Sequence, residues 1–154
     1  MAFSIEGSTS DELKILLVED SRGDATAFRR AMARINPSVS VSVASSAEEA
    51  ISLFERGADF GLCLFDINLP RLNGLELLAR VKPWRQSLPI MMLSSSEAAT
   101  EISMAFSRGA DGYVVKPSDF GGFDDIARYL CDLWFEGTPS QHAGKANVIL
   151  PNAA

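Results

Sequence analysis

Hydrophobic residues along the chain fall into five short apolar runs, separated by longer segments in which apolar and polar residues recur at helical spacing. Four runs are nearly continuous and end at a polar residue, which is the pattern of strands buried on both faces of a parallel sheet. In the remaining run valine alternates with serine, which indicates a strand with one less buried face. The expected strands are residues 14–18, 39–43, 62–66, 89–93 and 113–115.

The segments between these strands carry apolar residues three and four positions apart, as amphipathic helices do. Proline and glycine mark the expected helix ends, while serine and asparagine mark the starts. For the second helix, either Ser45 with Glu48 or Ser46 with Glu49 would form a capping box. The expected helices are residues 25–35, a segment opened by Ser45-Ser46 and ended by Gly57, a segment capped by Asn73 and ended by Pro83, residues 97–108 and residues 120–135.

Strict alternation of strands and helices predicts an α/β fold in which helices cover both faces of a parallel sheet. Because crossover connections are right-handed, we expect the flavodoxin-like, doubly wound arrangement: five strands in the order 2-1-3-4-5 with five helices. The domain would span residues 12–136, after a flexible N-terminal arm, residues 1–11. A polar tail, residues 137–154, would follow it. Whether the apolar residues 148–150 of this tail are a loose end or a dimerisation arm stays open.

Composition narrows the classes of partner. The 154 residues include 20 acidic and 14 basic side chains, giving a formal net charge of −6, which argues against non-specific binding to nucleic acid. No apolar run approaches the roughly 18 residues of a membrane span, and no signal-peptide pattern opens the chain. Cys63 and Cys131 fall in expected buried elements and are expected to be reduced thiols. We therefore expect a cytoplasmic protein that binds neither nucleic acid nor membrane.

Polar residues follow four of the five expected strands, where each strand ends. Glu19 and Asp20 end the first strand, Asp66 ends the third, Ser94 ends the fourth, and Lys116 ends the fifth. The carboxyl ends of parallel strands meet at one edge of the sheet, which is where open α/β sheets bind ligands. The sequence therefore predicts that three carboxylates, a hydroxyl and an amine gather there.

Three carboxylates so close together require a counter-charge. At about 5 Å and an effective dielectric near 20, each pair would repel by about 3 kcal/mol. Mg²⁺ prefers carboxylate and water oxygens, so we expect it to be held by Glu19, Asp20 and Asp66. The backbone carbonyl of Asn68 would add a further ligand.

A carboxylate beside Mg²⁺, an amine and a hydroxyl makes an acceptor for a phosphoryl group, because that transfer needs mainly charge neutralisation and alignment. Asp66 would attack as the nucleophile and become an acyl phosphate. Lys116 and Ser94 would bind the phosphoryl oxygens.

These motifs resemble the receiver domain of two-component response regulators over residues 12–135. The resemblance is specific because several separated motifs occur in order at the ends of the expected strands. The matching pieces are residues 16–20, residues 66–70 with Asn73-Gly74, Ser94, and residues 109–117.

The resemblance implies that a sensor histidine kinase transfers a phosphoryl group from its phosphohistidine to Asp66 in a Mg²⁺-dependent reaction. It also implies that Tyr113 changes rotamer when Ser94 engages the phosphoryl group, and that the Lys116–Pro117 peptide bond is cis. The sequences of residues 66–70 and 93–97 are similar to those of a single-domain subgroup that pairs with bacterial phytochrome-type kinases. Members of that subgroup often form homodimers through the surfaces of their fourth and fifth helices and a C-terminal arm.

The sequence departs from the family pattern at three places. Ser94 stands where many members have threonine, and the hydroxyl is kept. Ser21-Arg22 replaces the more usual Asn-Pro, which would alter kinase docking or the loop over the metal. Asn73 replaces a frequent aspartate, and the two are nearly equal as helix caps.

Each candidate site residue also has a plainer interpretation. Asp66 alone would suit a helix cap, Glu19-Asp20 a solvated turn, and Ser94 a cap for the fourth helix. Their convergence on one edge of the sheet favours a site. For Tyr113, a switch and a static core position are equally supported.

We therefore expect a single-domain response regulator that is a phosphoacceptor signalling protein rather than an enzyme. The alternative is a receiver-like binding module that acts without phosphorylation. An aspartate-nucleophile phosphatase is disfavoured because Asn68 stands where its general acid would be. A flavodoxin-like flavin carrier is disfavoured because Glu19-Asp20 would repel a phosphate.

Overall fold

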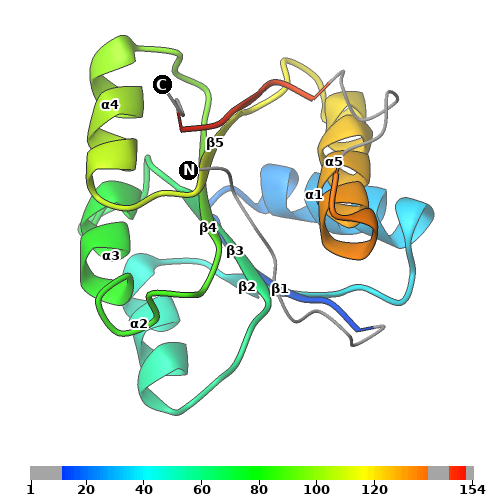
Figure 1. Ribbon diagram of the computed structural model, residues 1–154. Coiled ribbons are helices and arrows are strands. Elements are labelled where there is room, and N and C mark those ends of the chain that lie inside the picture. The colour runs from blue at the N-terminus through cyan, green and yellow to red at the C-terminus, as the bar shows by residue number, and fades with distance from the viewer. Residues whose placement is uncertain (1–11, 139–145, 152–154) are drawn as a thin grey trace.

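The computed structural model describes residues 12–138 and 146–151, which form one six-stranded sheet between two layers of helices (Figure 1). In chain order the elements are β1 (Lys14–Val18), α1 (Arg22–Ile35), β2 (Ser40–Ala44), α2 (Ala47–Glu55), β3 (Leu62–Asp66), α3 (Gly74–Val81), β4 (Ile90–Ser94), α4 (Ala99–Ser107), β5 (Gly112–Val115), the 3₁₀ turn η1 (Phe120–Gly122), α5 (Phe123–Glu136) and β6 (Val148–Ile149). The flavodoxin-like α/β fold is confirmed. The expected arm, residues 1–11, lies outside the described residues, as does part of the tail.

The first five strands are parallel and lie in the predicted order, β2-β1-β3-β4-β5. The sheet has a sixth strand that the sequence pattern did not predict. Val148 and Ile149 pair antiparallel with Val114 and Tyr113 of β5. Two residues are too short to show the period-two pattern of a strand. Val148 and Ile149 are therefore not a loose end, while a role of the tail as a dimerisation arm stays a prediction.

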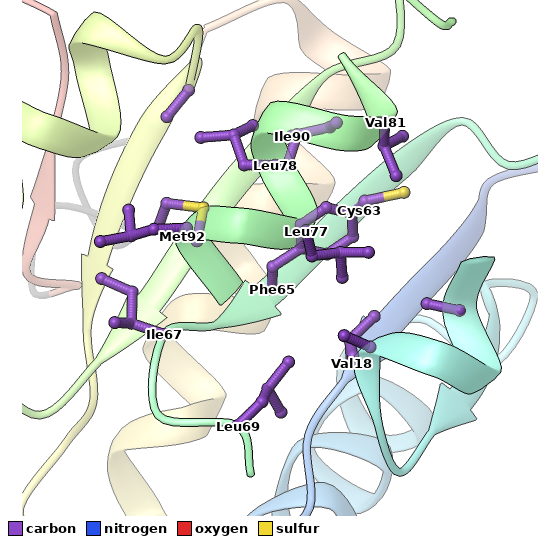
Figure 2. Close-up of a cluster of buried hydrophobic side chains, with 14 of the residues drawn as sticks. Val18, Cys63, Phe65, Ile67, Leu69, Leu77, Leu78, Val81, Ile90 and Met92 are labelled. Carbon is purple, nitrogen blue, oxygen red and sulfur yellow. The ribbon is translucent and has the colours of Figure 1, made fainter. Parts of the chain in front are cut away.

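Both faces of β3 are covered, which explains why its sequence is a continuous apolar run. Cys63 and Phe65 point into the cluster under α2, α3 and α4, while Leu62 and Leu64 point into the cluster under α1 and α5. Figure 2 shows Cys63 and Phe65 beside Leu77 of α3, with Val18 of β1 and Met92 of β4 nearby. The two cysteines are buried and free, as expected.

Side-chain caps fix where most helices begin. Ser21 caps α1 by accepting a hydrogen bond from the backbone N–H of Asp24, so this helix begins at Arg22 rather than at Ala25. For α2 the structure selects Ser46, which accepts from the backbone N–H of Glu49. The carboxylate of Glu49 reaches back to Ser45 rather than to Ser46.

At α3 the predicted cap Asn73 is confirmed, and it forms a capping box through reciprocal hydrogen bonds with Glu76. Helix α4 is shorter than predicted: it begins at Ala99, and its N-cap Ala98 provides no side-chain hydrogen bond. The fifth predicted helix divides into η1 and α5, and Gly137 ends it in the left-handed conformation that favours glycine.

No cis peptide bond occurs among the described residues, so the prediction for Lys116–Pro117 is wrong; trans is the lower-energy isomer even before proline. Among residues 12–138 and 146–151, no helix is long and apolar enough to cross a membrane.

The loop between β3 and α3 folds back tightly onto Asp66. A Cβ atom on Gly74 would lie 2.0 Å from the carbonyl oxygen of Asp66 and 2.9 Å from the Cα of Ile67. The backbone N–H of Gly74 also donates to the carbonyl of Ile67 at 3.0 Å. Only glycine allows this approach, so Gly74 helps to fix the backbone that carries Asp66.

We therefore predict that Gly74→Ala displaces the backbone at Asp66 and lowers the free energy of unfolding by about 1–3 kcal/mol, the usual cost of overpacking. Urea unfolding monitored by circular dichroism measures this. Gly121→Ala is the control, because its Cβ would meet only the flexible carboxylate of Asp119, at 3.2 Å. Equal stabilities of the two variants would contradict the prediction.

Candidate functional site

The predicted site residues gather at the carboxyl edge of the sheet. Asp66 and Ser94 are the last residues of β3 and β4, while Glu19 and Asp20 directly follow β1. Lys116 directly follows β5, and its backbone N–H donates to the carbonyl of Ser94 at 2.8 Å. Strand order alone therefore brings together residues that lie far apart in the sequence.

The three acidic residues form one cluster. Glu19, Asp20 and Asp66 each offer a carboxylate oxygen, and these oxygens all lie within 4.8 Å of one another. Glu19 and Asp66 are each 2% exposed, whereas Asp20 is open to solvent. An exposed carboxylate beside two buried ones leaves one side of the cluster accessible to an ion from solution.

Burial changes the protonation of the cluster. Burial, reinforced by the neighbouring carboxylate of Asp66, raises the pKa of Glu19 from its ordinary 4.5 to about 7, and the ammonium of Lys116 counteracts only part of this shift. The Oε2 atom of Glu19 accepts a hydrogen bond from the backbone N–H of Ser21 at 3.1 Å. Near neutral pH the cluster therefore has too little positive charge to keep Glu19 fully ionised.

The donor set fits a small hard cation. It consists of carboxylate oxygens, which Mg²⁺ prefers, and the Glu19 carboxylate is buried with too little positive charge beside it. Asn68 lies against the cluster, because its backbone N–H donates to Oδ1 of Asp66 at 3.1 Å. That its carbonyl oxygen binds the ion stays a prediction.

Lys116 is the positive centre of the site. Its Nζ lies 2.8 Å from Oε1 of Glu19, 2.9 Å from Oδ2 of Asp24 and 3.2 Å from Oδ2 of Asp66. Burial alone would lower the pKa of Lys116, but the surrounding carboxylates of Glu19, Asp24 and Asp66 raise it above its usual value. The ammonium therefore stays charged and directed at Asp66.

Sequence reasoning missed Asp24, the third carboxylate at this ammonium. The predicted start of the first helix at Ala25 placed Asp24 in a turn, whereas it belongs to the first turn of α1. The available signal was an acidic residue four positions after Asp20, behind a serine able to cap a helix.

Ser94, the last residue of β4, and Tyr113 of β5 both contact the loop between β4 and α4. Ser94 is fully buried, and its Oγ accepts a hydrogen bond from the backbone N–H of Ser96 at 3.0 Å. Tyr113 is also fully buried, and its hydroxyl donates to the carbonyl of Ser96 at 2.8 Å. Burial raises the pKa of Tyr113, so the phenol stays protonated. The ring is therefore anchored to the loop that follows Ser94, while its role as a switch stays a prediction.

Known response regulators are similar to this chain over most of its length. The protein-family model for the response regulator receiver domain matches residues 15–127. Response regulator MprA of Mycolicibacterium vanbaalenii is 28% identical over 137 residues, which are 89% of this chain and 57% of that protein. The chemotaxis protein CheY homolog of Campylobacter jejuni is 29% identical over 107 residues, covering 68% of this chain and 82% of that protein.

Several relatives are longer than this chain, which spans about half the length of MprA and of the nitrate/nitrite response regulator NarL of Escherichia coli. Among solved structures, the phosphorylated cyanobacterial phytochrome response regulator RcpA superposes with a TM-score of 0.75 at 25% identity, covering 84% of this chain and 99% of that chain. The Mn²⁺-bound form of response regulator Rcp1 gives a TM-score of 0.72 at 22% identity, over 83% and 99% of the two chains, which supports the fold.

The shifted pKa of Glu19 predicts how stability depends on pH without divalent metal. Below pH 4.5 the carboxyl is protonated in the folded and unfolded states. Between pH 4.5 and about 7 the unfolded state loses its proton first, so the folded state is progressively destabilised, by an amount on the order of 3 kcal/mol above pH 7. Glu19→Gln should therefore gain stability over the wild type as pH rises from 5 to 8.

Urea unfolding in the presence of a chelator at several pH values measures this difference, and added Mg²⁺ should shrink it by favouring the ionised wild-type carboxylate. Glu48→Gln is the control, because Glu48 is a half-exposed carboxylate paired with Arg71 on the surface. A pH-independent difference between Glu19→Gln and the wild type would contradict the prediction.

Proposed function

The chain belongs to the response regulator receiver domain family, and on that premise we propose that Asp66 accepts a phosphoryl group from a sensor histidine kinase. The observation that carries the proposal is the 3.2 Å contact between Nζ of Lys116 and Oδ2 of Asp66. It places a permanent positive charge at the carboxylate that would become phosphorylated.

In the proposed reaction a carboxylate oxygen of Asp66 attacks phosphorus, and the bond from phosphorus to the imidazole nitrogen of the kinase breaks. The imidazole leaves and takes up a proton, and Asp66 becomes an acyl phosphate. Mg²⁺, held by Glu19, Asp20 and Asp66, would neutralise charge on the transferring group when bound.

The remaining groups of the site stabilise the transferred phosphoryl group. Lys116 supplies a positive charge to a phosphoryl oxygen. Ser94 accepts a hydrogen bond from Ser96 through its oxygen, which leaves the hydroxyl proton available for a second phosphoryl oxygen. Hydrolysis of the acyl phosphate would return the free Asp66, so the covalent chemistry takes place on the protein itself and the chain acts as a signalling protein.

A signal would leave the site through the β4–α4 loop. Ser94 lies at its start, and Tyr113 is bound to it through the carbonyl of Ser96. A phosphoryl group that engages Ser94 would change this loop and the surface formed by α4, β5 and α5. That surface is where we propose that a downstream protein reads the state of Asp66.

The likeness to RcpA, whose description names it a phytochrome response regulator, supports a phytochrome-type kinase as the phosphoryl donor. Faster transfer from a purified phytochrome-type kinase than from an unrelated histidine kinase would support this donor class. Equal rates would remove the support, without affecting the proposed phosphorylation of Asp66.

The proposed phosphorylation is tested with acetyl phosphate and Mg²⁺, followed by intact mass spectrometry. We expect a single phosphoryl adduct on the wild type, none after chelation of the metal, and none on Asp66→Asn. Asp59→Asn is the control, because Asp59 is an exposed carboxylate on the loop before β3, and it should be modified like the wild type. An unmodified wild type would instead favour a binding module that acts without phosphorylation.

A further inference from the structure

Three carboxylates already surround the ammonium of Lys116. Its Nζ donates hydrogen bonds to Oδ2 of Asp24 and to Oδ2 of Asp66, and Oε1 of Glu19 lies 2.8 Å away as an ion pair. The side chain of Lys116 is only 14% exposed, so there is little room for another partner. A phosphoryl group on Asp66 must therefore share this ammonium with Glu19 and Asp24 unless one of them gives up its contact.

Burial decides which contact is exchangeable. On phosphorylation the negative charge of the buried Asp66 carboxylate passes to the phosphoryl group, which keeps Lys116 as its partner. The side chain of Glu19 is 0% exposed, so releasing it would leave a buried carboxylate without its partner, which is costly. The side chain of Asp24 is 24% exposed and can be hydrated when it lets go. Its backbone N–H is bound to Ser21, so the carboxylate can turn away while the helix stays in place.

We propose that Asp24 is a positioning residue that occupies the place of a phosphoryl oxygen at Lys116 and gives it up when Asp66 is phosphorylated. The inference rests on the proposed function. Before transfer, Asp24 holds the ammonium beside Asp66 at 2.9 Å. During transfer, it competes with the phosphoryl group for that ammonium and repels its negative charge. Asp24 therefore sets how readily the site accepts and keeps a phosphoryl group.

The test measures the affinity for beryllofluoride, a phosphoryl mimic, by isothermal titration calorimetry at saturating Mg²⁺. Asp24→Asn should bind it about three- to fivefold more tightly than the wild type, the range of a partly exposed charge pair, and Asp24→Ala at least as tightly. The acyl phosphate formed with acetyl phosphate should also persist longer in both variants.

Asp124→Asn is a matched control. Asp124 lies in the first turn of α5, as Asp24 does in α1, and it pairs with a cation, Arg34, at a comparable exposure of 30%. This control should lose a similar helix-terminal charge and keep the wild-type affinity for beryllofluoride.

Stability separates the proposed role from a merely structural one. Asp24→Asn should lower the free energy of unfolding, because Lys116 loses a charged partner, while it raises the affinity for the mimic. An affinity equal to or weaker than that of the wild type would overturn the inference about Asp24. Failure of the wild type itself to bind the mimic, or unchanged binding by Asp66→Asn, would instead overturn the proposed function.

Discussion

The candidate site depends on the ammonium group of Lys116. Lys116, at the end of β5, contacts carboxylates that come from the end of β1, the first turn of α1 and the end of β3. Two of these carboxylates are almost fully buried, and without a positive charge their desolvation would be prohibitive. The raised pKa of Glu19 shows that one lysine does not fully compensate them. The site is therefore short of positive charge in a way that favours a divalent cation.

The packing of the core supports this arrangement because it fixes the register of the strands. Leu62 to Phe65 alternate between two separate clusters, so β3 cannot shift by one residue without exchanging its buried faces. Asp66 follows without a break, and the loop behind it is fixed by the approach of Gly74. The carboxylate thus extends from a strand that is buried on both faces, which would suit the proposed in-line attack on phosphorus.

The sequence allowed the strand order and the gathering of Glu19, Asp20, Asp66, Ser94 and Lys116 to be predicted, because topology alone places the ends of parallel strands together. Details that depend on side-chain contacts across the chain were not predictable. Asp24 reaches Lys116 only because α1 begins at Arg22, one turn earlier than its apolar spacing indicated. The choice of Ser46 over Ser45 at α2 depends on backbone geometry, since both serines have a glutamate three residues on. The strand β6 has only two residues and carries no periodic signal.

The strand β6 also affects how this protein meets other chains. The outer side of β5 would otherwise present unpaired backbone groups, which form a template for association with any extended peptide. Val148 and Ile149 satisfy two positions of that template from within the same molecule, at the high effective concentration of a tethered segment. A partner strand that pairs with β5 must first displace Val148 and Ile149, so the chain itself competes for this edge of the sheet.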